Sequence, residues 1–160
     1  LNAKVTKTVA DIEVIKNSAS FIRLTTGFWP GSSWPESKGN GGNDPTLDPL
    51  SCYCDGGNTF LFNKSSLITN TWRGPYMAEW PKNVNGGTYF FDFNERDQNG
   101  DGIDYERVLW IDNGRDNGNF RFERSLSQAI DDKWDDGNLS TGTVQIWQGS
   151  NLGVIIHQGN

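Results

Sequence analysis

The clearest pattern of apolar and polar positions lies at the start of the chain, between Ala3 and Thr26. Apolar residues recur there at steps of three and four, which places one apolar stripe along a helix. Gly27 suits the left-handed position after a helix, and Pro30 prevents the helix from resuming. We therefore predict a long helix packed on a sheet. Its stripe consists of Val5, Val9, Ile12, Ile15, Ala19 and Ile22.

Strand patterns begin only in the second half of the chain. Three runs rich in aromatic or β-branched residues are joined by Asp, Asn and Gly turns, which predicts an antiparallel meander. In the third run, Phe120 and Phe122 alternate with polar residues and share one face. The three runs are residues 88–95, 106–113 and 119–123, and a later pair at 142–147 and 152–158 predicts a hairpin.

A second helix is predicted over residues 125–137, with Leu126, Ile130 and Trp134 at four-residue steps and Gly137 as its stop. It carries two acidic pairs, Asp131-Asp132 and Asp135-Asp136, and pairs of carboxylates occur in glycosidases. Adjacent residues on a helix do not face one another, however. We therefore interpret these acids as solvated or helix-capping residues.

The order of these elements predicts an α+β fold with one long helix lying on an antiparallel sheet. The 160 residues suit a single domain over 1–160, and 19 glycines indicate long Gly/Asn/Asp-rich loops. We divide it into a long helix at 1–27, a variable loop at 28–58, and a region at 59–160 that holds the sheet, a short helix and a candidate metal loop.

Composition excludes several classes of function. A net charge of −6 argues against nucleic acid and anionic lipid as partners. The chain has neither an apolar stretch of membrane-spanning length nor a visible signal peptide. Its single histidine, His157, lies in an apolar run that reads as a strand, so we expect no enzyme. Cys52 and Cys54 leave three alternatives open: a strained disulfide, two free thiols, or half of a metal site.

The sharpest local motif is DQNGDGIDYE, which resembles the first part of a calcium loop. Asp97, Asn99 and Asp101 take positions 1, 3 and 5, Gly102 takes the turn position, and Ile103 would offer its backbone carbonyl. Position 12 is not acidic, so the bidentate glutamate of an EF-hand is missing. The residues that could replace it are Glu106, Asp104, Asp112 and Asp116. The alternative is a solvated Asx-rich turn without an ion.

Three segments together resemble type IV pilin-like proteins and type II secretion pseudopilins. The first is Ala3-Lys4, Ala10-Asp11-Ile12 and the Thr-Gly-Phe-Trp-Pro run at 26–30. The second is GPYMAEWPKNVNGGTYFF, carried by Gly74, Pro75, Tyr76, Pro81, Gly86, Gly87 and Tyr89. The third is IDDKWDDGNLSTGTVQI at 130–146, similar to an Asp-Asp-Gly-Asn-x-x-Thr-Gly segment of some pilin-like subunits.

The resemblance implies a pilin-like fold and a structural subunit of a secretion pseudopilus or a type IV pilus. Its partners would be identical or related pilin subunits and the assembly machinery, in the periplasm or at the cell surface. Family members begin with about 25 apolar residues that anchor them in the inner membrane and later form the filament core; these are absent here, so the opening helix is expected to be a truncated one. A calcium-stabilised C-terminal loop is also implied.

A second class of function is a calcium-dependent carbohydrate-binding module. Seven tryptophans are present, and three of them, Trp34, Trp72 and Trp80, lie in predicted loops where their faces could stack on a sugar. Burial in the core or in an interface is the alternative role for the same residues.

Overall fold

The computed structural model describes residues 1–26, 73, 81–87, 89–94, 100–103, 106–111, 122–147 and 151–158. The described elements follow the order α1 (Asn2–Thr26), β1 (Tyr89–Asn94), β2 (Glu106–Ile111), α3 (Arg124–Trp134), β3 (Val144–Trp147) and β4 (Asn151–His157). This is an α+β arrangement, as the sequence predicts. The predicted variable loop, both cysteines and the three loop tryptophans lie outside the described residues.

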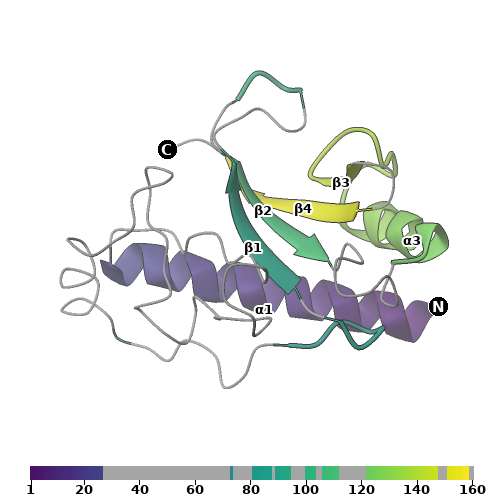
Figure 1. The fold of residues 1–160 in the computed structure, drawn as a ribbon, viewed down its shortest axis with the longest axis horizontal. Coiled ribbons are helices and arrows are strands. Elements are labelled where there is room, and N and C mark those ends of the chain that lie inside the picture. Colours follow the sequence, from purple (N-terminus) through teal and green to yellow (C-terminus); the bar gives the residue numbers. More distant parts are fainter. Residues whose placement is uncertain are drawn as a thin grey trace.

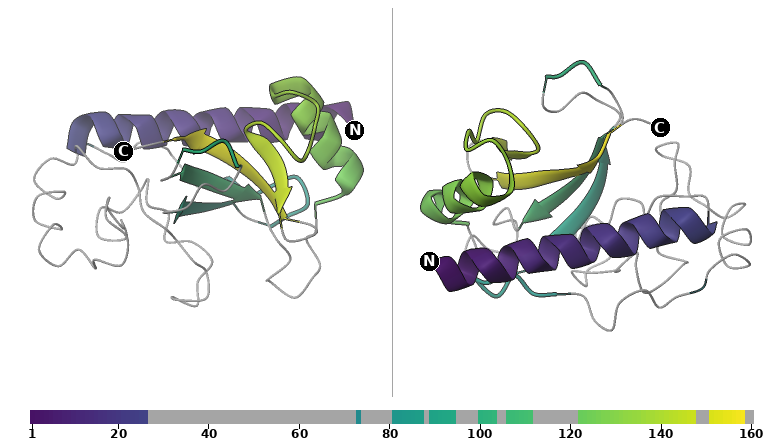
Figure 2. Two further views of the ribbon diagram at one scale, coloured as in Figure 1. Left: turned by 90° about the horizontal axis from the view of Figure 1, so that it is seen from above. Right: turned by 180° about the vertical axis from the view of Figure 1, so that it is seen from behind.

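α1 is a 25-residue helix that lies across one face of the sheet, with α3 beside its first turns (Figures 1 and 2). The predicted apolar stripe is its inner face, because five of the six residues are buried and Val9 packs against them. Thr8 and Ser18 are buried on the same side. The helix prediction is therefore confirmed in both extent and orientation.

The sheet has four antiparallel strands in the order β1-β2-β4-β3. β2 pairs with β1 through Tyr89 opposite Ile111 and with β4 through Ile111 opposite Leu152. Side chains at alternate positions face α1 and form one core with it and with α3. The strand contributions to this core are Tyr89, Leu109, Ile111, Val144, Leu152, Val154 and Ile156.

The predicted meander is wrong at the end of its third run, where residues 122 and 123 are described; residues 119–121 lie outside the described residues. Phe122 and Glu123 lie outside any strand and lead directly into α3, with Glu123 in an extended conformation at the helix N-cap. β4 pairs with β2 on the side away from β1. Phe122 is buried in the core although it lies directly before a helix and not in a strand.

Asp11 joins α1 to the rest of the domain through polar contacts. Its Oδ2 accepts a hydrogen bond of 2.8 Å from the Tyr89 hydroxyl and one of 2.5 Å from the Lys7 ammonium. Lys7 also donates to the carbonyl of Lys82, in the turn that precedes β1. Burial, helped by the hydrogen bond to Asp11, raises the pKa of Tyr89 far above its usual value, so this hydroxyl stays a donor.

The turn before β1 is built around Asn83. Its side-chain Oδ1 accepts hydrogen bonds from the backbone N–H groups of Asn85 and Gly87, and Gly86 adopts a φ of 88°. Asn83 is buried, so these bonds satisfy its amide oxygen in the interior. In the part of the chain that the structure describes, no helix combines the length and apolar character needed to cross a membrane.

Replacing Ile12 by alanine tests the core beneath α1. Ile12 is completely buried, so removing its methyl and methylene groups should lower the free energy of unfolding by about 2–5 kcal/mol in urea titrations. Val14→Ala is the matched control, since Val14 is half exposed and should change stability by less than about 0.5 kcal/mol. Equal effects of the two substitutions would contradict the assigned orientation of α1.

Candidate metal centre

The C-terminal end of α3 is positioned by its apolar side. Leu126 and Ile130 are buried in the core, which fixes the rotation of the helix and turns the next residue, Asp131, inward as well. The helix ends at Trp134, and the N–H of Asp135 donates to the carbonyl of Asp131 at 2.8 Å. Gly137, with a φ of 80°, then turns the chain toward β3.

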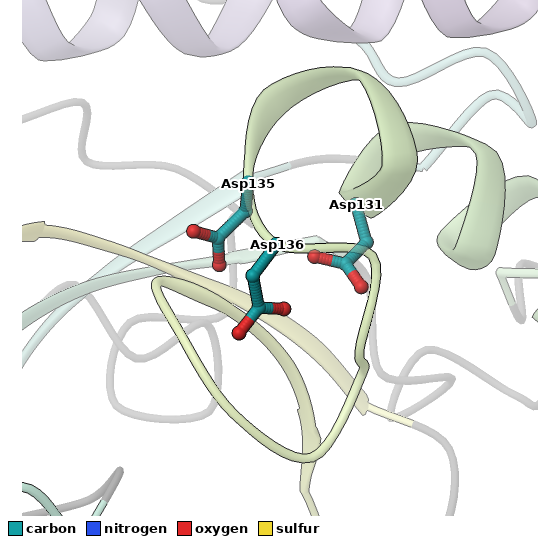
Figure 3. Close-up of side chains that lie close together, drawn as sticks. All are labelled: Asp131, Asp135 and Asp136. Atoms are coloured by element: carbon teal, nitrogen blue, oxygen red, sulfur yellow. The ribbon is translucent and has the colours of Figure 1, made fainter.

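Three carboxylates meet at this helix end. Asp131, Asp135 and Asp136 each offer an oxygen, and these oxygens all lie within 4.8 Å of one another. Figure 3 shows the carboxylate of Asp131 reaching from α3 toward the other two, which follow the last helical turn. Asp131 is buried, Asp135 is half-buried and Asp136 is exposed, so the cluster runs from the interior to the surface.

Asp135 is held by the chain that enters β3. Its Oδ2 accepts hydrogen bonds from the backbone N–H groups of Thr143 and Val144, the latter at 2.8 Å. Gly142 makes this possible: it has a φ of 75°, and a Cβ at that position would overlap the Asp135 carboxylate. The other oxygen of Asp135 has no such donor among the described residues and is available to a ligand.

Asp136 is held by the same loop. Its Oδ1 accepts from the N–H of Asn138 at 2.8 Å, and its Oδ2 accepts from the hydroxyl of Thr141 at 2.7 Å. The hydrogen bond from Thr141, followed by the one from Asn138, keeps the pKa of Asp136 below its usual value. This exposed carboxylate is therefore charged at neutral pH.

Asp131 is the unusual member of the cluster. Its side chain is completely buried, and within the part of the chain that the structure describes neither oxygen has a hydrogen-bond partner. Burial, followed by the nearby charges of Asp135, Asp136 and Asp132, raises its pKa from 3.8 to about 6. The Gly137 N–H offsets part of this rise without reaching hydrogen-bond geometry with either oxygen.

The interpretation of these acids as solvated is therefore wrong for Asp131. Adjacent acids on a helix point in different directions, but residues four apart are neighbours. Asp131 lies four residues before Asp135, so these two carboxylates can meet. Asp131 also follows Ile130 directly, at the edge of the buried side. The cluster can hold a metal ion, because carboxylate oxygens converge there without a lysine or arginine from the described residues to neutralise them.

The predicted calcium loop is only partly described. Asp97 and Asn99 lie outside the described residues, whereas Asp101, Ile103 and Glu106 lie within them. Gly102 has the positive φ, 86°, that a tight turn requires. The ligand set predicted there, Asp97, Asn99, Asp101, Ile103 and Glu106, stays a prediction.

Two of these residues are brought together by a third that sequence reasoning did not select. Gln158 Nε2 donates to Asp101 Oδ2 at 2.6 Å and to Glu106 Oε1 at 3.2 Å. Asp101 Oδ1 accepts from the N–H of Ile103 at 2.8 Å, so it closes a local turn. Glu106 is completely buried. The side-chain amide of Gln158 therefore lies between the carboxylates of Asp101 and Glu106.

Comparison with known protein families, curated proteins and solved structures found no match for this chain.

Asp131→Asn tests the electrostatic cost of a charged Asp131 in the metal-free protein. In chelator-treated protein the folded state holds the Asp131 proton more tightly than the unfolded chain, because its pKa is raised from 3.8 to about 6. Ionisation of Asp131 therefore lowers stability progressively between these two pH values, and the full loss is present above about pH 6. The asparagine variant should therefore melt at a higher temperature than the parent at about pH 7.5 and at nearly the same temperature below about pH 4. A variant that is less stable than the parent at neutral pH would contradict this account.

Gly142→Ala tests the close approach of the loop to Asp135. The added Cβ meets both a positive φ and the carboxylate, so the free energy of unfolding should fall by more than about 1 kcal/mol. Gly100→Ala is the control, since its φ is also positive, 77°, but no atom lies within 4 Å of the new Cβ. If urea titrations show that both variants lose the same free energy of unfolding, the close approach of residue 142 to Asp135 does not contribute to stability.

Proposed function

We propose that this chain is a structural subunit of a type II secretion pseudopilus or a type IV pilus, and that it assembles with identical or related subunits through α1. The long helix packed by one face on an antiparallel sheet agrees with the fold that the sequence resemblance implies. The subunit would act in the periplasm or at the cell surface, anchored in the inner membrane before assembly.

The observation that carries the proposal is the outer face of α1. Three large apolar side chains on this face are exposed: Val14 by 50%, Phe21 by 58% and Leu24 by 79%. A helix that serves only to cover a sheet is polar on its far side. Exposed apolar side chains that share one helix face indicate a surface that another molecule covers.

The spacing on the outer face suits packing against a second helix. Exposed residues follow one another there at alternating steps of four and three, the repeat that supports lengthwise helix pairing. A polar residue within such a repeat favours one register of pairing. The residues are Ala3, Lys7, Ala10, Val14, Asn17, Phe21 and Leu24.

The metal ion in this proposal is calcium, which would stabilise the C-terminal half of the subunit. Carboxylate clusters without histidine or cysteine are typical of hard cations. The alternative function, a carbohydrate-binding module, depended on Trp34, Trp72 and Trp80, which lie outside the described residues. No described feature favours it.

Phe21→Glu tests assembly through α1. In cells that express the gene from its native locus, we expect loss of the sheared surface filaments or of pseudopilus-dependent secretion, because a charge replaces an exposed apolar contact. The isolated variant should keep its stability within about 0.5 kcal/mol, since Phe21 faces outward.

Ser20→Glu is the matched control. Ser20 is an exposed neighbour on α1 that lies outside the four-three repeat, so a glutamate there should leave assembly intact. Normal filaments and secretion in the Phe21→Glu strain, or in a strain without the gene, would overturn the proposed function.

A further inference from the structure

We propose that Asp131, Asp135 and Asp136 form a calcium site that links the end of α3 to the start of β3. This site is separate from the loop that the DQNGDGIDYE motif predicts. The inference rests on the calcium part of the proposed function and does not depend on filament assembly.

The buried carboxylate of Asp131 is the observation that points to a ligand. A buried carboxylate that accepts no hydrogen bond from the described residues is costly in the folded protein, since the charge loses its water and only the nearby Gly137 N–H offsets part of that loss. Its oxygens lie within reach of two further carboxylates, and no lysine or arginine among the described residues pairs with the three. A cation between them would satisfy the oxygens that the described residues leave without partners.

The helix end adds to the negative potential. The last carbonyls of α3 carry the negative end of the helix dipole, and the only basic residue of the last turn is Lys133, which is exposed. Asp132, also in this turn, accepts a hydrogen bond from Gln128 and contributes a fourth negative charge. The helix end is thus organised to attract a cation rather than an anion.

The oxygen spacing fits a cation of the size of calcium. Two oxygens that bind calcium at about 2.3–2.6 Å can lie up to about 4.6–5.2 Å apart, and the three oxygens here lie within 4.8 Å of one another. Asp131 can offer both oxygens and Asp135 its Oδ1, whereas the oxygens of Asp136 already accept hydrogen bonds and have lone pairs to spare. Water can complete the shell from the exposed side, beside Asp136.

The consequence of binding is a closed connection between helix and sheet. Asp135 already holds the backbone of Thr143 and Val144, the point where β3 begins, and Asp136 holds the preceding loop through Thr141. A calcium ion shared with Asp131 would fasten that loop to the buried side of α3. The ion would therefore stabilise the α3–β3 connection.

Calorimetric titration of chelator-treated protein with calcium chloride tests the site. We expect binding with a dissociation constant of about 0.1–1 mM, the range of extracellular calcium modules, together with a rise in melting temperature. Asp131→Asn and, separately, Asp136→Asn should each weaken binding by about tenfold or more. Asp136 is exposed, so its variant reports on ligand loss without disturbing the core.

Asp132→Asn is the matched control, since Asp132 lies in the same turn, is exposed and is outside the cluster; removing its charge should weaken calcium binding far less than the roughly tenfold loss expected at the cluster residues. Asp101→Asn and Glu106→Gln should likewise retain this binding. No binding up to roughly 10 mM calcium, well above the expected constant, would overturn the site. So would binding that survives Asp131→Asn but is lost in Asp101→Asn, or tighter binding of magnesium than of calcium.

Discussion

Burial of one face of α1 against the sheet is the interaction on which the rest of the structure depends. Each fully buried isoleucine or valine contributes about 1.5–3 kcal/mol, and the inner face presents such residues over most of its length. This packing fixes which side of the helix faces outward. The exposed apolar repeat is therefore a consequence of the core: once Ile12 and Ile15 turn inward, Val14 and Phe21 must turn outward.

Burial of an apolar helix face also explains the position of the acidic cluster. Leu126 and Ile130 orient α3 through the core, and this orientation brings Asp131 into the interior beside two carboxylates that the following loop holds in place. Backbone N–H groups and a threonine hydroxyl fix Asp135 and Asp136, whereas Asp131 accepts no hydrogen bond from the described residues. The carboxylates of Asp135 and Asp136 are thus held by hydrogen bonds, whereas the described residues leave the buried carboxylate of Asp131 without them.

Local periodicity was sufficient to predict α1, α3, β1, β2 and the β3–β4 pair, because repeats of apolar residues directly report which face is buried. Strand order was not predictable in this way. The pairing of β2 with β4 joins distant residues, and the alternation around Phe122 resembles a strand although it precedes a helix. The acidic cluster was not predicted because the position of Asp136 depends on where α3 ends, which the sequence does not fix. The four-residue spacing of Asp131 and Asp135 was the one available signal that these two carboxylates lie close together.

The strand order also has a consequence for how the domain is made. α1 is synthesised first among the described elements and β4 last, yet β4 lies between β2 and β3 and carries Leu152 and Val154 into the core beneath α1. The ribosome must therefore deliver β4 before the core beneath α1 is complete. Until then part of the inner face of α1 lacks its final cover, a situation in which chaperones commonly engage newly made chains.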